Sequence, residues 1–77
     1  MPSHRDHEWE NHEVFLNLSN DETLCNLCVR AIRFSVSLDK AAAYVLDQLH
    51  SLGQFKTPYS NVTYTRENVR AALADME

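Results

Sequence analysis

The sequence predicts a small, mainly helical domain with one short strand near its N-terminus. Three observations carry this prediction: an alternating apolar stretch over residues 14–18, two segments with helical hydrophobic spacing, and a shorter helical segment at the C-terminus. The predicted order is strand, helix, helix, C-terminal helix. The 77-residue length indicates one domain with a marginal core, since so short a chain buries only about 60% of its unfolded surface.

The first twelve residues are polar, have no hydrophobic period and contain three of the four histidines. We therefore expect residues 1–12 to form a flexible polar arm and residues 13–77 to form a single small domain. Trp9 is the large apolar side chain of this arm. It is expected to dock on the domain or on a partner.

The predicted strand is followed directly by a helix-start signal. Apolar and other side chains alternate here, as in a half-buried strand: Val14, Leu16 and Leu18 against Glu13, Phe15 and Asn17. Ser19 is followed three residues later by Glu22, the spacing of a capping box. The strand is thus expected to end at Leu18 and a helix to begin at Asn20.

Three helical faces follow along the chain. Their apolar positions recur at three- and four-residue steps: Leu24, Leu27, Cys28, Ala31 and Ile32; then Leu38, Ala41, Ala42, Val45, Leu46, Leu49 and Leu52; then Val69, Ala72, Leu73 and Met76. Ser37 and Thr65 are predicted N-caps of the second and third helix, and Gly53 is a predicted left-handed C-cap.

A lone strand is unstable because its backbone groups need a hydrogen-bonding partner. The stretch at residues 61–65, "NVTYT", could supply that partner within the chain, which would give a small α+β domain. The same strand of a second copy could also supply it, which would give a homodimer. The sequence leaves both arrangements open.

The order of strand, capped helix, serine-containing turn and helix over Val14 to Leu52 resembles the ribbon-helix-helix family. The resemblance implies a dimer in which two strands pair and read DNA through outward side chains. The matching positions are Glu13, Phe15 and Asn17, and only Asn17 suits a base edge. The turn also lacks the glycine usual in that family, so the resemblance implies the fold more than the DNA-reading function.

The charge and composition of the chain limit the classes of function that we expect. The net charge is −4 and no block of Lys or Arg is present, which disfavours a nucleic-acid surface. No apolar run is long enough for a membrane span and no secretory signal is evident, so we expect a cytoplasmic protein with reduced cysteines. Cys25 and Cys28 are expected to be apolar filler, and we expect neither a metal site nor another cofactor.

We expect a non-enzymatic, acidic protein-binding module, because no nucleophile and base can be paired from the sequence. By size and charge it resembles phage-type, anti-CRISPR-like inhibitors of nucleic-acid-handling machinery. The alternative is a ribbon-helix-helix transcriptional regulator or antitoxin. The candidate partner-binding residues are Trp9, Glu13, Phe15, Asn17, Tyr59 and Tyr64.

Overall fold

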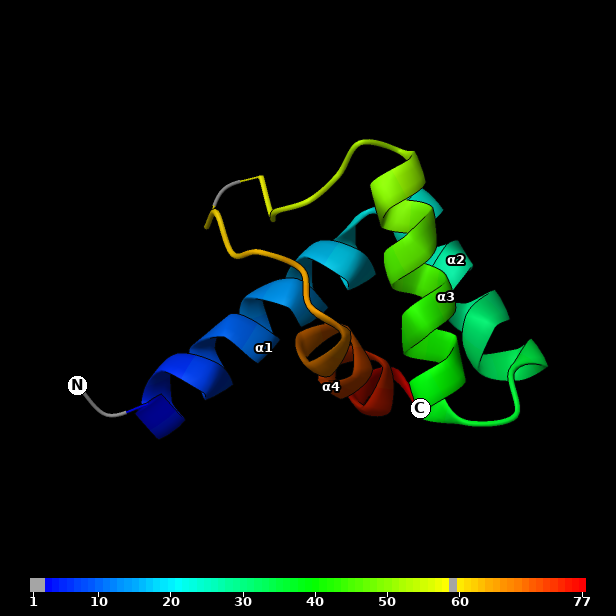
Figure 1. Ribbon diagram of the computed structural model, residues 1–77, viewed down its shortest axis with the longest axis horizontal. Helices are drawn as coiled ribbons and strands as arrows, with labels where there is room; N and C mark the ends of the chain where they lie inside the picture. Colours follow the sequence, from blue (N-terminus) through cyan, green and yellow to red (C-terminus); the bar gives the residue numbers. More distant parts are fainter. Residues whose placement is uncertain (1–2, 59) are drawn as a thin grey trace.

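The computed structural model describes residues 3–58 and 60–77, and this part of the chain contains four α-helices and no strand. The helices are α1 (Ser3–Asn20), α2 (Glu22–Phe34), α3 (Leu38–Ser51) and α4 (Arg66–Met76), as Figure 1 shows. The prediction of a strand-helix-helix fold, either as a ribbon-helix-helix-like dimer or as a small α+β domain, is therefore wrong.

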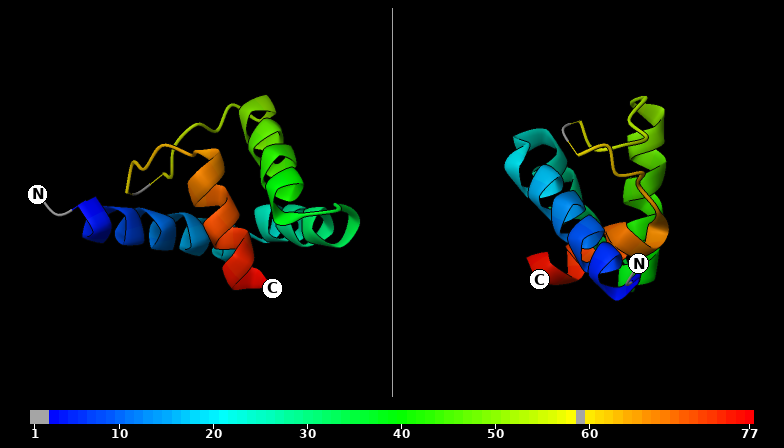
Figure 2. Two further views of the ribbon diagram at one scale, coloured as in Figure 1. Left: turned by 60° about the horizontal axis from the view of Figure 1, so that its bottom comes forward. Right: turned by 90° about the vertical axis from the view of Figure 1, so that its left-hand side faces the viewer.

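The helices pack around one another in an elongated body of 38 × 23 × 18 Å. A short turn at residues 35–37 joins α2 to α3, and these two helices lie side by side in opposite directions. The C-terminal helix α4 packs against both α1 and α3, and it crosses α1 steeply (Figure 2). Consequently α4 ties the N-terminal helix to the α2–α3 pair.

The segment predicted as a strand lies in the second half of α1. Val14 and Leu18 are fully buried there, while Leu16 between them is 36% exposed. The same stretch also fits helical spacing, because Val14 and Leu18 are four residues apart and Phe15 and Leu18 are three apart. Five alternating residues cannot distinguish the two periods, and no glycine or proline interrupts residues 3–20.

The predicted boundary between a polar arm and the domain falls within a helix. Residues 3–12 form the first turns of α1, which continues without a break to Asn20. The first two residues of the predicted arm lie outside the described part of the chain. The flexibility of residues 3–12 stays a prediction.

The helix start after α1 is shifted from the predicted position. Asp21, in extended conformation, is the N-cap of α2, and its carboxylate accepts a hydrogen bond of 3.1 Å from the Leu24 amide. Ser19 instead belongs to α1 and its hydroxyl donates to the Leu16 carbonyl at 3.3 Å. The predicted capping box of Ser19 and Glu22 is therefore wrong, because the preceding residues are already helical.

The later caps are confirmed. The Ser37 hydroxyl accepts from the Lys40 amide at 3.2 Å, and α3 begins at Leu38. Thr65 and Asn68 form a reciprocal capping box at the start of α4. Gly53, after the end of α3, has a φ of +77°, which a residue with a side chain adopts only at a cost.

The loop between α3 and α4 is held by two buried polar side chains. Thr57 accepts from the Val62 amide at 2.9 Å, and the Asn68 amide donates to the Thr63 carbonyl at 2.8 Å. Lys56 and Thr63 form an isolated antiparallel bridge, so residues 61–65 are extended but do not form a strand. These bonds fix the loop across the C-terminal half of α1, as Figure 1 shows.

All four helices and the loop contribute to one core. The three predicted helical faces supply most of it, with Leu24, Cys28, Ala31, Ala41, Ala42, Val45, Leu49, Val69, Ala72 and Leu73 all buried. Val14 and Leu18 of α1, together with Val62 and Tyr64 of the loop, complete it. At the predicted second face, however, Leu52 lies outside the core and is 58% exposed.

Candidate functional site

Two adjoining hollows lie along the seam between α2 and α3. The first has a volume of about 340 Å³ and is lined by Arg30, Ala31, Phe34, Ser35 and Tyr44. The second has a volume of about 350 Å³ and is lined by Thr23, Asn26, Leu27, Arg30, Gln48 and Leu52. Because Arg30 lines both hollows, we treat them as one feature, the α2–α3 groove, defined by these ten residues.

The groove follows from helical spacing beside the core. On α2, Thr23, Leu27, Arg30 and Phe34 recur at steps of four, three and four residues, on the shoulder of the buried stripe. On α3, Tyr44, Gln48 and Leu52 recur at steps of four. The end of α2 faces Tyr44 whereas its start faces Leu52, as the antiparallel arrangement of the two helices requires.

Large apolar side chains are unusually exposed along the α2–α3 groove and at the turn beside it. Phe34 is 84% exposed and Val36, in the turn, is 90% exposed. Tyr44 and Leu52 are also exposed, at 49% and 58%. A phenylalanine this exposed covers little of the helix end beside it, so the apolar surface lacks a structural purpose within the chain.

The charge of the groove is positive although the chain is acidic. Arg30 is the charged residue among those that line it, and Arg33 lies one position before Phe34 on the solvent side of α2. Among the side chains that the structure describes, in residues 8–58 and 60–77, the ion pair present joins Arg70 to Asp39, with 2.7 Å between Nε and Oδ1. Arg30 is exposed and pairs with none of the described carboxylates.

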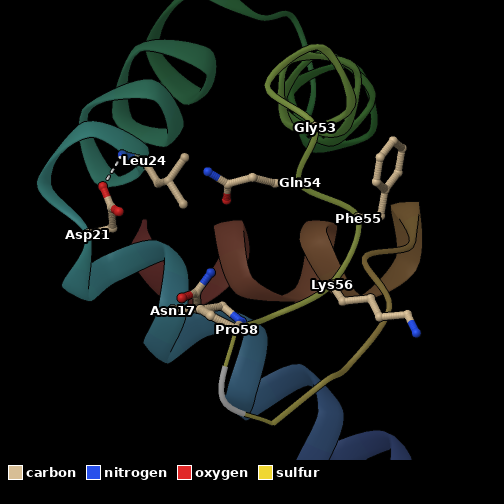
Figure 3. A pocket seen from close by; sticks show the side chains of 8 residues that line it. All are labelled: Asn17, Asp21, Leu24, Gly53, Gln54, Phe55, Lys56 and Pro58. Atoms are coloured by element: carbon tan, nitrogen blue, oxygen red, sulfur yellow. Dashed lines mark hydrogen bonds between the residues drawn. The ribbon is translucent and has the colours of Figure 1, made fainter.

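A third hollow of about 530 Å³ lies where α1, α2 and the loop after α3 meet. In Figure 3 the side chains of Leu24 and Gln54 approach one another across it, while Phe55 and Lys56 point away. Two of its polar groups already serve the fold. Asp21 caps α2, and the Asn17 amide donates to the Tyr64 hydroxyl. We therefore regard this corner as structural.

The predicted partner-binding residues are divided between surface and interior. Trp9 is 50% exposed on α1, and Glu13 and Phe15 of the same helix are half-buried, with Phe15 packed against the core. Tyr64 is buried at 3% exposure, and Asn17 is bonded to it. A role in binding for these residues stays a prediction, and the structure makes Tyr64 inaccessible.

One predicted residue, Tyr59, lies outside the described part of the chain. Two other aromatic side chains, Phe34 and Phe55, lie at the surface. Phe55 stacks on the exposed ring of His50 with 5.0 Å between ring centroids. That contact occupies one face of each ring at the C-terminal end of α3.

The cysteines lie where the helical pattern places them. Cys28 is fully buried and Cys25 lies at the edge of the core, both as free thiols. Burial, with a smaller contribution from Cys25, raises the pKa of Cys28 to about 12, so its thiol is neutral at physiological pH. No cluster of three His, Cys, Asp or Glu side chains that could hold a metal occurs among the described residues.

Sequence reasoning did not identify Arg30, Tyr44 or Leu52 as surface candidates. Leu52 continues the apolar stripe of α3 and was assigned to the core, and Tyr44 and Arg30 look like ordinary solvent-facing residues. The available signal was the shoulder position of Arg30 and Phe34 on α2. That position indicates a groove only when α3 is known to lie beside α2.

No family model matches the sequence, and comparisons with curated proteins and with solved structures gave no significant match. In the described part of the chain, each helix is too short or too polar to cross a membrane.

Proposed function

We propose that the chain is a non-enzymatic protein-binding module that engages its partner through the α2–α3 groove. The observation that supports this most is the exposure of Phe34 and Val36 at the α2–α3 turn, beside a groove lined by Tyr44 and Leu52. Exposed apolar surface rimmed by polar residues is typical of protein interaction sites. Aromatic and arginine side chains are the residue types most enriched at the energetic centres of such interfaces.

The composition of the groove supports binding over catalysis. Its ten lining residues include an arginine, two amides and two aliphatic hydroxyls, but no carboxylate, imidazole, thiol or amine. The hydroxyls of Thr23, Ser35 and Tyr44 act as nucleophiles only where an adjacent base activates them, and the groove lining supplies no such base. The groove does offer apolar area, a planar cation and hydrogen-bonding amides, which are the groups that bind a protein partner.

A finer proposal is that the module is a phage-type inhibitor of nucleic-acid-handling machinery. Its support is the small size and the net charge of −4, which suit a protein that covers a basic site on a larger partner. It draws no support from the groove, whose own charge is positive. The alternative ribbon-helix-helix regulator needed a paired strand at residues 14–18, which belong to α1, and is not carried further.

A display library of helical peptides tests the proposed function. The library would have 16-residue helices with four randomised positions on one face, selected against the whole chain. We expect peptides whose affinity falls about tenfold or more for Phe34→Ala and for Tyr44→Ala. Truncating a residue at the energetic centre of an interface typically lowers the affinity by this much.

The matched controls are Trp9→Ala and Phe55→Ala, which remove similarly exposed aromatic side chains away from the groove. Their affinities for the same peptides should stay within about twofold of the wild type. The proposed function is overturned if no peptide is enriched, or if the enriched peptides lose affinity in the control variants and not in the groove variants.

A further inference from the structure

We infer that the α2–α3 groove accepts an amphipathic helix of another protein, with a carboxylate placed between two apolar anchors about seven residues apart. This inference rests on the proposed function and names the chemistry of the partner. It follows from the length of the groove, the spacing of its apolar ends and the charge between them.

The length of the groove suits a helix. Its lining residues on α2 run from Thr23 to Phe34, and those on α3 run in the opposite sense from Leu52 to Tyr44. At 1.5 Å per residue, Thr23 to Phe34 is a length of about 17 Å, or about three turns of an occupant. An amphipathic helix laid in such a seam buries one apolar face, which is a recurrent mode of peptide recognition.

The apolar ends of the groove set the spacing of the anchors. Phe34 and Tyr44 form one end, and Leu27 and Leu52 form the other. Leu27 and Phe34 are seven residues apart on one helix, which corresponds to about 10.5 Å along the axis. An occupant helix that lies along the seam reaches both ends with side chains at positions i and i+7.

The middle of the groove sets the charge of the occupant. Arg30 lies between Leu27 and Phe34 and lines both hollows, and it makes no ion pair with the acidic side chains that the structure describes. Covering an arginine with an apolar helix face would strip its water without replacement, which is costly. A carboxylate at position i+3 or i+4 of the occupant would accept its paired N–H groups.

A second copy of this chain does not fit the same description. A two-fold interface places the same patch on both sides, so the two Arg30 side chains would meet near its centre. The lining residues contain no carboxylate to separate them. The charge therefore favours a different protein over self-association through this groove.

The peptide library described above tests the inference through the identity of the residues it selects. Positions i, i+3, i+4 and i+7 of the helix are randomised, and selection is repeated on wild type, Arg30→Glu and Arg66→Glu. Arg66→Glu is the matched control, because it makes the same charge change on an exposed residue at the start of α4.

On the wild type and on Arg66→Glu, we expect enrichment of Leu, Ile or Phe at i and i+7 and of Asp or Glu at i+3 or i+4. On Arg30→Glu, we expect Lys or Arg at the central positions and about tenfold weaker binding of the acidic peptides. Enrichment of groove-binding peptides without central acids, or with the same central acids on Arg30→Glu, overturns this inference and leaves the proposed function standing. Failure to enrich any peptide overturns both.

Discussion

At the scale of single residues, Leu16 and Leu18 show most clearly what the chain does near its N-terminus. In a strand both would share one face, because side chains two positions apart point the same way. In α1 they lie about 200° apart around the axis, so Leu18 is fully buried and Leu16 is 36% exposed. The two leucines are chemically identical, and their difference in burial comes from the helical period alone.

This difference predicts unequal effects of the same truncation. Leu18→Ala should lower the free energy of unfolding by about 2–5 kcal/mol, because it removes a buried side chain and leaves a cavity. Leu16→Ala should cost less than about 1 kcal/mol, since its side chain is already partly in water. Urea denaturation followed by circular dichroism measures both, and equal losses would indicate that the segment is not helical.

The raised pKa of Cys28 makes the free energy of unfolding depend on pH in the alkaline range. Its pKa is raised from the ordinary value of 9.0 to about 12 in the folded chain, so unfolding releases its proton when the pH lies between these two values. The stability that this group contributes is complete below about pH 9 and is lost as pH rises towards 12. The free energy of unfolding should fall there by at most about 1.4 kcal/mol per pH unit.

Urea titrations between pH 8 and 11 measure that slope. Cys28→Ala should be less stable at pH 8 but should show a shallower fall, with a remainder from Tyr64, whose pKa is also raised by burial. Cys25→Ala should keep most of the wild-type slope, because burial and not Cys25 is the larger cause of the raised pKa of Cys28. Parallel slopes for wild type and Cys28→Ala would contradict the assignment.

At the scale of the elements, Asp21 separates α1 from α2 and sets where the chain turns. Its backbone is extended, at φ −91° and ψ 116°, and its carboxylate satisfies the Leu24 amide in the first turn of α2. The amide of Asp21 still donates to the Asn17 carbonyl at 3.3 Å, which closes the last turn of α1. One residue thus ends one helix and starts the next.

The position of this cap can be tested with two neighbouring substitutions. Asp21→Ala should lower the free energy of unfolding by about 1 kcal/mol, the usual cost of losing an N-cap. Ser19→Ala should change it by less than about 0.5 kcal/mol, because Ser19 is within α1 and bonds only to the Leu16 carbonyl. Thermal denaturation of both variants measures the order, and a larger loss for Ser19→Ala would restore the predicted capping box.

The sequence predicted α2, α3 and α4 because each has a long apolar stripe, and it placed the N-caps of α3 and α4 correctly but that of α2 at Ser19 in place of Asp21. It failed at α1, where one apolar set fits two periods and polar residues fill the first three turns. Such a helix is stabilised by packing against α4 and not by its own hydrophobic pattern. Its presence therefore depends on a tertiary contact that the local sequence does not reveal. The α2–α3 groove was missed for the same reason, since it exists only between two helices.

At the scale of the whole molecule, the loss of the strand removes the reason for expecting a homodimer. Residues of α1, α4 and the loop complete the core within one chain. The described residues contain no strand whose unpaired edge could bind a second copy. In the α2–α3 groove, where Phe34, Tyr44 and Leu52 are exposed, Arg30 opposes two-fold pairing. We therefore expect the chain to be a monomer.

We predict a monomer of 8.9 kDa at micromolar concentration in size-exclusion chromatography with light scattering. A stable dimer would contradict it. If a dimer formed, Arg30→Glu would show whether the groove were its interface, because the charge change would alter the dissociation constant only in that case.

The central claim is that the α2–α3 groove is the binding surface, and a nuclear magnetic resonance titration of the labelled chain with a selected helical peptide tests it most directly. We predict that the amide shifts change along residues 23–34 and 44–52, with contacts from the peptide to the side chains of Phe34 and Tyr44. Shift changes centred on residues 8–17 of α1 or on the loop at residues 53–58, with the groove unaffected, would contradict the claim.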